Sequence, residues 1–191
     1  MIASPKGVRA TRKTGLKLRP GERPFRLKSG DELQKLLQRA LADADGVTGA
    51  HCIHERWMRG DFAAHIEADL TMLWKSAAPS IPDWLPMRYI SWLAAAYEVA
   101  ARSVATGRGR TNVYLILLDF QDRRGDDYGV YVGMSRYPAA QRFDQHMAGI
   151  RASGAVLKRG LEVLNGPVLH LQHIPPQRSR ADRSGVGACA G

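Results

Sequence analysis

Residues 112–135 read NVYLILLDFQDRRGDDYGVYVGMS, and this stretch decides the fold of the C-terminal part of the chain. It opens with a short apolar run bounded by polar residues, which is typical of a buried strand. Residues 128–134 are rich in aromatic and β-branched side chains and predict a second strand. The segment between them, 121–127, is a polar turn with Gly125 at its centre. The pattern therefore predicts a β-hairpin.

Helical patterns follow the hairpin. A helix is expected from Pro138 to about residue 152, and a second one over roughly 155–164. Gly166 and Pro167 end the second helix, and 168–171 is expected to supply a third strand. The apolar face of the first helix is expected to carry Phe143, Met147 and Ile150.

Two strand tyrosines and two helix residues follow one another in a defined order. Tyr114 lies on the first strand, and Tyr131 and Gly133 lie on the second. Arg142 and His146 are four residues apart, so they share one face of the following helix. In order and spacing this resembles the GIY-YIG nuclease domain, with Asn-Val-Tyr and Tyr-Val-Gly in place of its two triplets. The resemblance covers about residues 110–173.

The resemblance implies an α/β (α+β) fold, with a small three-stranded antiparallel sheet and flanking helices. It also implies a DNA endonuclease that uses a divalent metal, Mg or Mn. Negative charge builds on the phosphoryl oxygens during cleavage, and a fixed guanidinium with paired donors at an exposed position, that of Arg142, suits them. A tyrosine near pKa 10 is a poor base, so Tyr114 would need a metal-bound water or neighbours that lower its pKa. Tyr131 would orient water or phosphate, and His146 would bond a tyrosine or the phosphate.

Three further residues are candidate substrate contacts. Gly133 would let the backbone and the substrate approach closely. Lys158 and Arg159 could contact phosphate from the second helix, although a solvated helix face explains them better. Asn112 departs from the glycine of the family pattern, and asparagine tolerates unusual backbone angles.

The metal ligand is the missing part of the pattern. The family holds its metal through one glutamate on a helix after the third strand. Residues 176–191 contain no glutamate, their only acid is Asp182, and Glu162 precedes the expected third strand. We therefore leave the metal ligands unassigned and expect the chain to end before its ligand or to read into unrelated sequence there. The chain is accordingly expected to cleave poorly or not at all.

The rest of the chain divides by composition. Residues 1–28 hold nine basic residues and one acid, and we expect them to form a disordered basic arm. This arm carries +8 of the formal net charge of +10. Residues 29–107 are expected to form a helical region, 110–175 the GIY-YIG-like domain, and 176–191 an irregular tail. Helices are expected near 31–44, 61–77 and 86–104, the first capped by Ser29 or Asp31 and the third with Pro86 near its first position.

Composition limits the class of protein. No apolar run is long enough to span a membrane, and the two cysteines fit a reducing cytoplasm. Cys52 is expected to be a buried apolar residue, and His51 and His54 to be structural. A basic arm attracts polyanions, so the expected partner is nucleic acid, with DNA preferred and RNA left open. Two other readings remain: a non-catalytic nucleic-acid-binding module and a helical protein-interaction protein.

Overall fold

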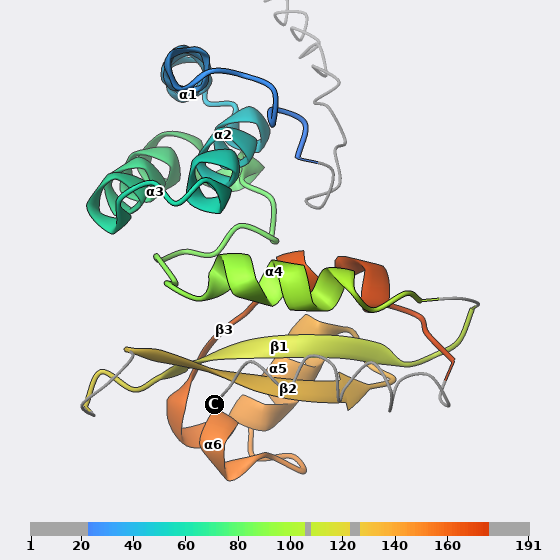
Figure 1. Cartoon of the computed structure of the whole chain (residues 1–191). Helices are drawn as coiled ribbons and strands as arrows, with labels where there is room; N and C mark the ends of the chain where they lie inside the picture. The colour runs from blue at the N-terminus through green and yellow to red at the C-terminus, as the bar shows by residue number, and fades with distance from the viewer. Residues whose placement is uncertain (1–22, 106–107, 123–126, 176–191) are drawn as a thin grey trace, which may run out of the picture.

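The computed structural model describes residues 23–105, 108–122 and 127–175. Its N-terminal part is a group of three helices. These helices are α1 (Gly30–Ala42), α2 (Gly46–Met58) and α3 (Ala63–Ala77), followed by a short 3-10 turn, η2 (Ala78–Ser80). They form one end of the molecule, and the sheet lies toward the other (Figure 1).

The start of α1 follows the predicted signal. The Ser29 hydroxyl accepts a hydrogen bond from the Glu32 amide at 3.2 Å, and the Glu32 carboxylate accepts one from the Ser29 amide at 2.7 Å. This capping box satisfies two amides that the helix itself leaves unpaired. The prediction of a Ser29 cap is confirmed.

The helix α2 was not predicted. It lies between α1 and α3, and most of its residues from Gly49 to Glu55 are buried, including His51, Cys52 and His54. A helix that is buried on most sides has no polar face, so its sequence lacks the amphipathic period that reveals a surface helix. Cys52 is fully buried, as expected of a small apolar residue.

The third predicted helix begins later than expected. The helix α4 spans Leu93–Ala101, so Pro86 lies before it and not in its first turn. Similarly, α3 begins after Phe62, and Asp61 forms an ion pair with Arg56 at 2.7 Å instead of opening the helix.

The sheet has three antiparallel strands, which confirms the predicted α+β class. They are β1 (Asn112–Asp119), β2 (Tyr128–Ser135) and β3 (Gly160–Val163), in the order β2-β1-β3. The prediction of a third strand at 168–171 was wrong. That segment belongs to a 3-10 helix, η3 (Gly166–Leu171), and the third strand comes from residues expected to end the second helix.

The two helices after the hairpin are shorter than predicted. The helix α5 spans Ala139–Met147, and α6 spans Gly154–Arg159. Gly149 has a φ of 77°, a conformation that ends a helix readily. Met147 is 46% exposed and Ile150 is 56% exposed, so neither belongs to a buried face, contrary to the prediction.

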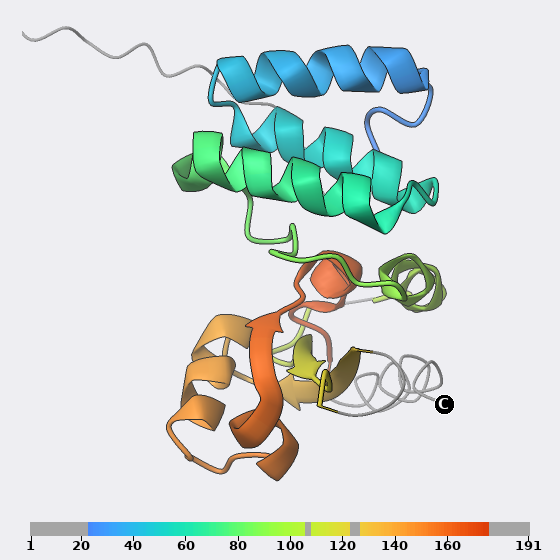
Figure 2. The ribbon, with the colours of Figure 1, turned by 90° about the vertical axis from the view of Figure 1, so that its left-hand side faces the viewer.

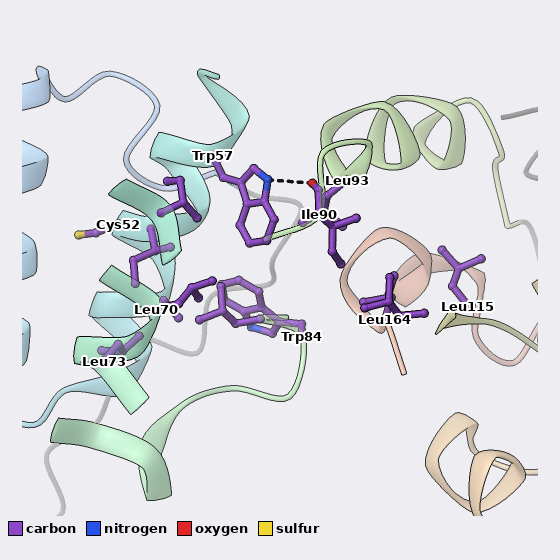
Figure 3. Close-up of a cluster of buried hydrophobic side chains, with 14 of the residues drawn as sticks. Cys52, Trp57, Leu70, Leu73, Trp84, Ile90, Leu93, Leu115 and Leu164 are labelled. Carbon is purple, nitrogen blue, oxygen red and sulfur yellow. Dashed lines mark hydrogen bonds between the residues drawn. The ribbon is translucent and has the colours of Figure 1, made fainter. Parts of the chain in front are cut away.

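Each face of the sheet packs against different helices. The helices α4 and η3 lie between the N-terminal helices and the sheet, while α5 and α6 lie on the opposite side of the sheet (Figures 1 and 2). Alternate residues of β1 therefore enter two cores. The larger core joins the sheet to α2 and α3 through Trp57, Trp84, Leu93, Leu115 and Leu164 (Figure 3).

Residues 23–28 of the predicted basic arm are folded. Arg23 forms an ion pair with the buried Glu55 at 2.9 Å, and Phe25 packs against the larger core. Residues 23–28 therefore belong to the folded part of the chain. Residues 1–22 and the predicted tail from 176 onward lie outside the described residues.

Candidate functional site

Both candidate tyrosines lie on the sheet face that α5 covers. In the β1–β2 register, Tyr114 is opposite Gly133 and Ile116 is opposite Tyr131. Side chains of opposed residues lie on the same face, and residues two apart in a strand share that face. The hairpin thus brings Tyr114 and Tyr131 together, and α5 adds His146.

These three rings form a compact cluster. The Tyr114 hydroxyl oxygen lies 3.1 Å from His146 Nε2. The ring centroids of Tyr131 and His146 are 5.7 Å apart, and those of the two tyrosines are 6.2 Å apart. Tyr114 and His146 are 2% and 1% exposed, whereas Tyr131 is partly exposed. The structure therefore brings together three of the predicted site residues, with Tyr131 nearest to solvent.

The loop after α5 sets the tautomer of His146. The amide of Ser153 donates a hydrogen bond to Nδ1 of His146 at 3.0 Å. A backbone N–H can only donate, so Nδ1 carries no proton and the neutral ring carries its proton on Nε2. His146 therefore donates to the Tyr114 oxygen, which leaves the Tyr114 hydroxyl proton available for another acceptor. No pattern in the sequence indicated the contribution of Ser153.

The electrostatics of the cluster favour neutral groups. Burial raises the pKa of Tyr114, Tyr131 raises it further, and the Arg142 guanidinium opposes both effects. Burial also lowers the pKa of His146, and Arg142 adds to that lowering. A tyrosine whose pKa is raised is a hydrogen-bond donor at neutral pH and a weak base.

Gly133 is required by Tyr114. A methyl group at position 133 would collide with the Tyr114 ring, including a contact of 2.7 Å with Cε2. The Tyr114 ring crosses the strand where a side chain of β2 would otherwise lie. The close approach expected at Gly133 is thus made by this ring.

Arg142 is held by the loop that follows α5. Its guanidinium donates to the carbonyl oxygens of Ile150 at 3.1 Å and Arg151 at 2.7 Å, and to Gln145 Oε1 at 3.1 Å. The side chain is partly buried, not fully exposed as predicted. Arg142 therefore orders the segment that carries Ser153, in addition to being close enough to Tyr114 to influence its pKa.

Lys158 and Arg159 are not brought to this cluster. Arg159 donates to both carboxylate oxygens of Asp122, at 2.6 and 2.8 Å, and to the Asp119 carbonyl. Asp119 ends β1, five residues beyond Tyr114, which corresponds to roughly 17 Å along a strand. Together with Gln121, these residues line a separate surface hollow.

Asn112 has a structural role that the sequence did not reveal. Its amide nitrogen donates to the Tyr137 carbonyl at 3.1 Å, and its amide oxygen accepts from the His173 amide at 3.0 Å. Asn112 is not among the described residues with positive φ, so its tolerance of unusual angles is not used. The side chain links the loop before α5 to the segment after η3.

The described residues do not fit the expected metal ligands. Among them, no group of three or more His, Cys, Asp or Glu side chains could hold a metal ion. Glu162 lies in β3 and not before the third strand, and its carboxylate accepts from the Met87 amide at 3.1 Å and pairs with Arg88. It is opposite Leu117 in the register, hence on the face away from Tyr114. Asp182 lies outside the described residues.

Comparisons with known proteins gave no match: no family model, no characterised protein and no solved structure resembles the chain significantly. In the part of the chain that the structure describes, no helix is long and apolar enough to cross a membrane.

Proposed function

We propose that the chain is a GIY-YIG-like nuclease domain protein that binds a DNA phosphodiester at Tyr114, Tyr131, Arg142 and His146. The observation that supports this most is the hydrogen bond between Tyr114 and His146 at 3.1 Å, beside Tyr131 on one sheet face. This hydrogen bond joins a strand residue to a helix residue, and the family resemblance had selected both residues before their contact was known.

The proposed contacts follow from the protonation states. The Tyr114 oxygen accepts from His146, so its own proton can be donated to a phosphate oxygen. Tyr131 offers a second hydroxyl nearer to solvent, and Arg142 supplies positive charge. Donors of this kind suit an anionic phosphodiester.

Binding with little cleavage is the form of this function that the described residues favour. The pKa of Tyr114 is raised, which opposes a role as general base, and the described residues include no group of three or more His, Cys, Asp or Glu side chains that could hold a metal ion. Hydrolysis of a phosphodiester needs an activated water, and a tyrosine with a raised pKa is a poor base for activating it. A non-catalytic DNA-binding module on the same site is the second candidate, for the same reason.

Paired single-atom variants test the site. Tyr131→Phe should weaken the affinity for a short DNA duplex about fivefold, the effect of one hydrogen bond. Tyr128→Phe is the matched control, because Tyr128 lies on the same strand but packs on the opposite face. Fluorescence anisotropy would measure both affinities. Equal affinities for both variants and the wild type would remove Tyr131 from the site.

Cleavage is tested by titrating magnesium or manganese into the full chain with supercoiled plasmid. We expect weak nicking or none. Robust nicking that is lost in Tyr114→Phe would contradict this expectation and would establish a complete nuclease site. Removal of residues 1–22 should reduce the salt dependence of DNA binding. With fewer phosphate contacts, binding releases fewer counterions.

A further inference from the structure

One tyrosine near the candidate site packs against neither core. All six tyrosines lie among the described residues. Five of them belong to one of the two cores or pack against it, namely Tyr89, Tyr97, Tyr114, Tyr128 and Tyr131. Tyr137 does neither and is 50% exposed. Its ring therefore remains open to a ligand, whereas the other five rings are used for packing.

The backbone of Tyr137 is nevertheless fixed. Its amide donates to Ser135 Oγ at 3.0 Å, and its carbonyl oxygen accepts from Asn112 Nδ2 at 3.1 Å. Pro138 follows it, and a proline restricts the backbone of the residue before it. An exposed ring on a fixed backbone loses little freedom when a ligand binds, and this favours binding.

The two side chains that hold Tyr137 place it beside the candidate site. Asn112 and Ser135 are opposite each other in the β1–β2 register, two residues beyond the pair Tyr114 and Gly133. Residues two apart share a face of the sheet, so this pair lies on the Tyr114 face, about 7 Å further along the strands. Nucleotides of one DNA strand repeat about every 3.4 Å. Tyr137 is therefore within a few nucleotides of a phosphate bound at Tyr114.

The neighbouring groups indicate which ligand the ring would contact. Arg136 precedes Tyr137 and is exposed, and Arg142 lies on α5, the helix that follows. A DNA strand whose phosphate is bound here carries its bases close to the ring. Aromatic side chains bind bases by stacking on them, whatever the sequence. In a duplex the faces of a base are covered by its neighbours, so only an unpaired nucleotide offers its face to Tyr137.

We propose that Tyr137 stacks on an unpaired base next to the phosphodiester bound at Tyr114, so that the ligand of this site is DNA with a single-stranded segment. This inference rests on the proposed function of the site and specifies its ligand. The stacking is insensitive to sequence, because every base presents a flat aromatic face.

Two DNA ligands test the proposal, with fluorescence anisotropy of the full chain at one salt concentration. One ligand is a fully paired duplex, and the other is the same duplex with a short run of unpaired thymidines in one strand. The wild type should bind the second ligand about tenfold more tightly, the effect of one stacked base. Equal affinities for the two ligands would overturn this inference and leave the proposed phosphodiester site intact. Absence of binding to both would overturn the proposed function and this inference together.

Variants assign the preference to the ring. Tyr137→Leu removes the ring and should abolish the preference, whereas Tyr137→Phe keeps the ring and should retain it. Neither change touches a core, and the backbone bonds to Ser135 and Asn112 remain, so both variants fold. Phe62→Leu is the matched control and should retain the preference, because Phe62 is also exposed but lies at the start of α3. A preference that survives in Tyr137→Leu, or that is lost in Tyr137→Phe, would refute the stacking.

Discussion

Acidification should destabilise the fold through His54. Burial is the main cause of its lowered pKa, followed by the charges of His51 and Arg23, while Glu55 acts in the opposite direction. From α4, the neutral Tyr97 ring faces it. In the unfolded chain the pKa returns to an ordinary value, so the unfolded state binds the extra proton more readily.

The direction and the size of the pH effect on stability follow from this difference in pKa. Because the folded-state pKa is the lower one, the stabilisation is complete above about pH 6.5 and is lost as the pH falls toward about 4. The interval between 6.5 and about 4 corresponds to about 3 kcal/mol, since one pKa unit is about 1.4 kcal/mol. That is a large part of the stability of an ordinary domain, about 5–15 kcal/mol.

Urea denaturation of the wild type and His54→Leu at about pH 7 and about pH 4.5 measures the effect. His54→Leu should lose about 2–3 kcal/mol less than the wild type over this interval. His65→Leu, which changes an exposed histidine of α3, should keep the wild-type acid sensitivity. The same loss in His54→Leu and in the wild type would show that His54 does not titrate as its burial requires.

Three further changes test the packing around the candidate site. Gly133→Ala should destabilise the fold by about 1–3 kcal/mol in urea, because the methyl group collides with the Tyr114 ring; Tyr114→Ala in the same chain should recover part of the loss. Arg142→Ala should cost about 1–2 kcal/mol and speed amide exchange in the loop after α5, since it removes bonds to two carbonyls there; unchanged exchange would contradict this. Glu162→Ala should cost about 1–3 kcal/mol, because the Met87 amide loses its acceptor; unaltered stability would show that the bond contributes nothing.

The hairpin and the candidate cluster were accessible from the sequence because their signals are local. Two β-rich runs joined by a polar turn fix the pairing of β1 with β2. Because strand side chains alternate between the two faces of the sheet, this pairing puts Tyr114 and Tyr131 on one face. The same holds for the start of α1, where Ser29 and Glu32 are only three residues apart.

The third strand could not be predicted, since short apolar runs adopt whichever structure their neighbours allow. By composition 168–171 is the better strand candidate, because 160–163 contains Gly160 and Glu162 and both residue types are depleted in strands. The edge of β1 pairs with 160–163, while Gly166 and Pro167 turn 168–171 into η3. The buried helix α2 was not predicted for a different reason. Tertiary contacts cover nearly its whole surface, so its sequence has no polar stripe.

The sequence by itself determined the α+β class, the hairpin and the identity of the residues that meet beneath it. Only the tertiary structure decided their chemistry. The Ser153 amide fixes the proton of His146 on Nε2, and burial raises the pKa of Tyr114. Both effects depend on contacts that only the folded chain makes, where a hydrogen bond and the loss of water change which protonation state is favoured.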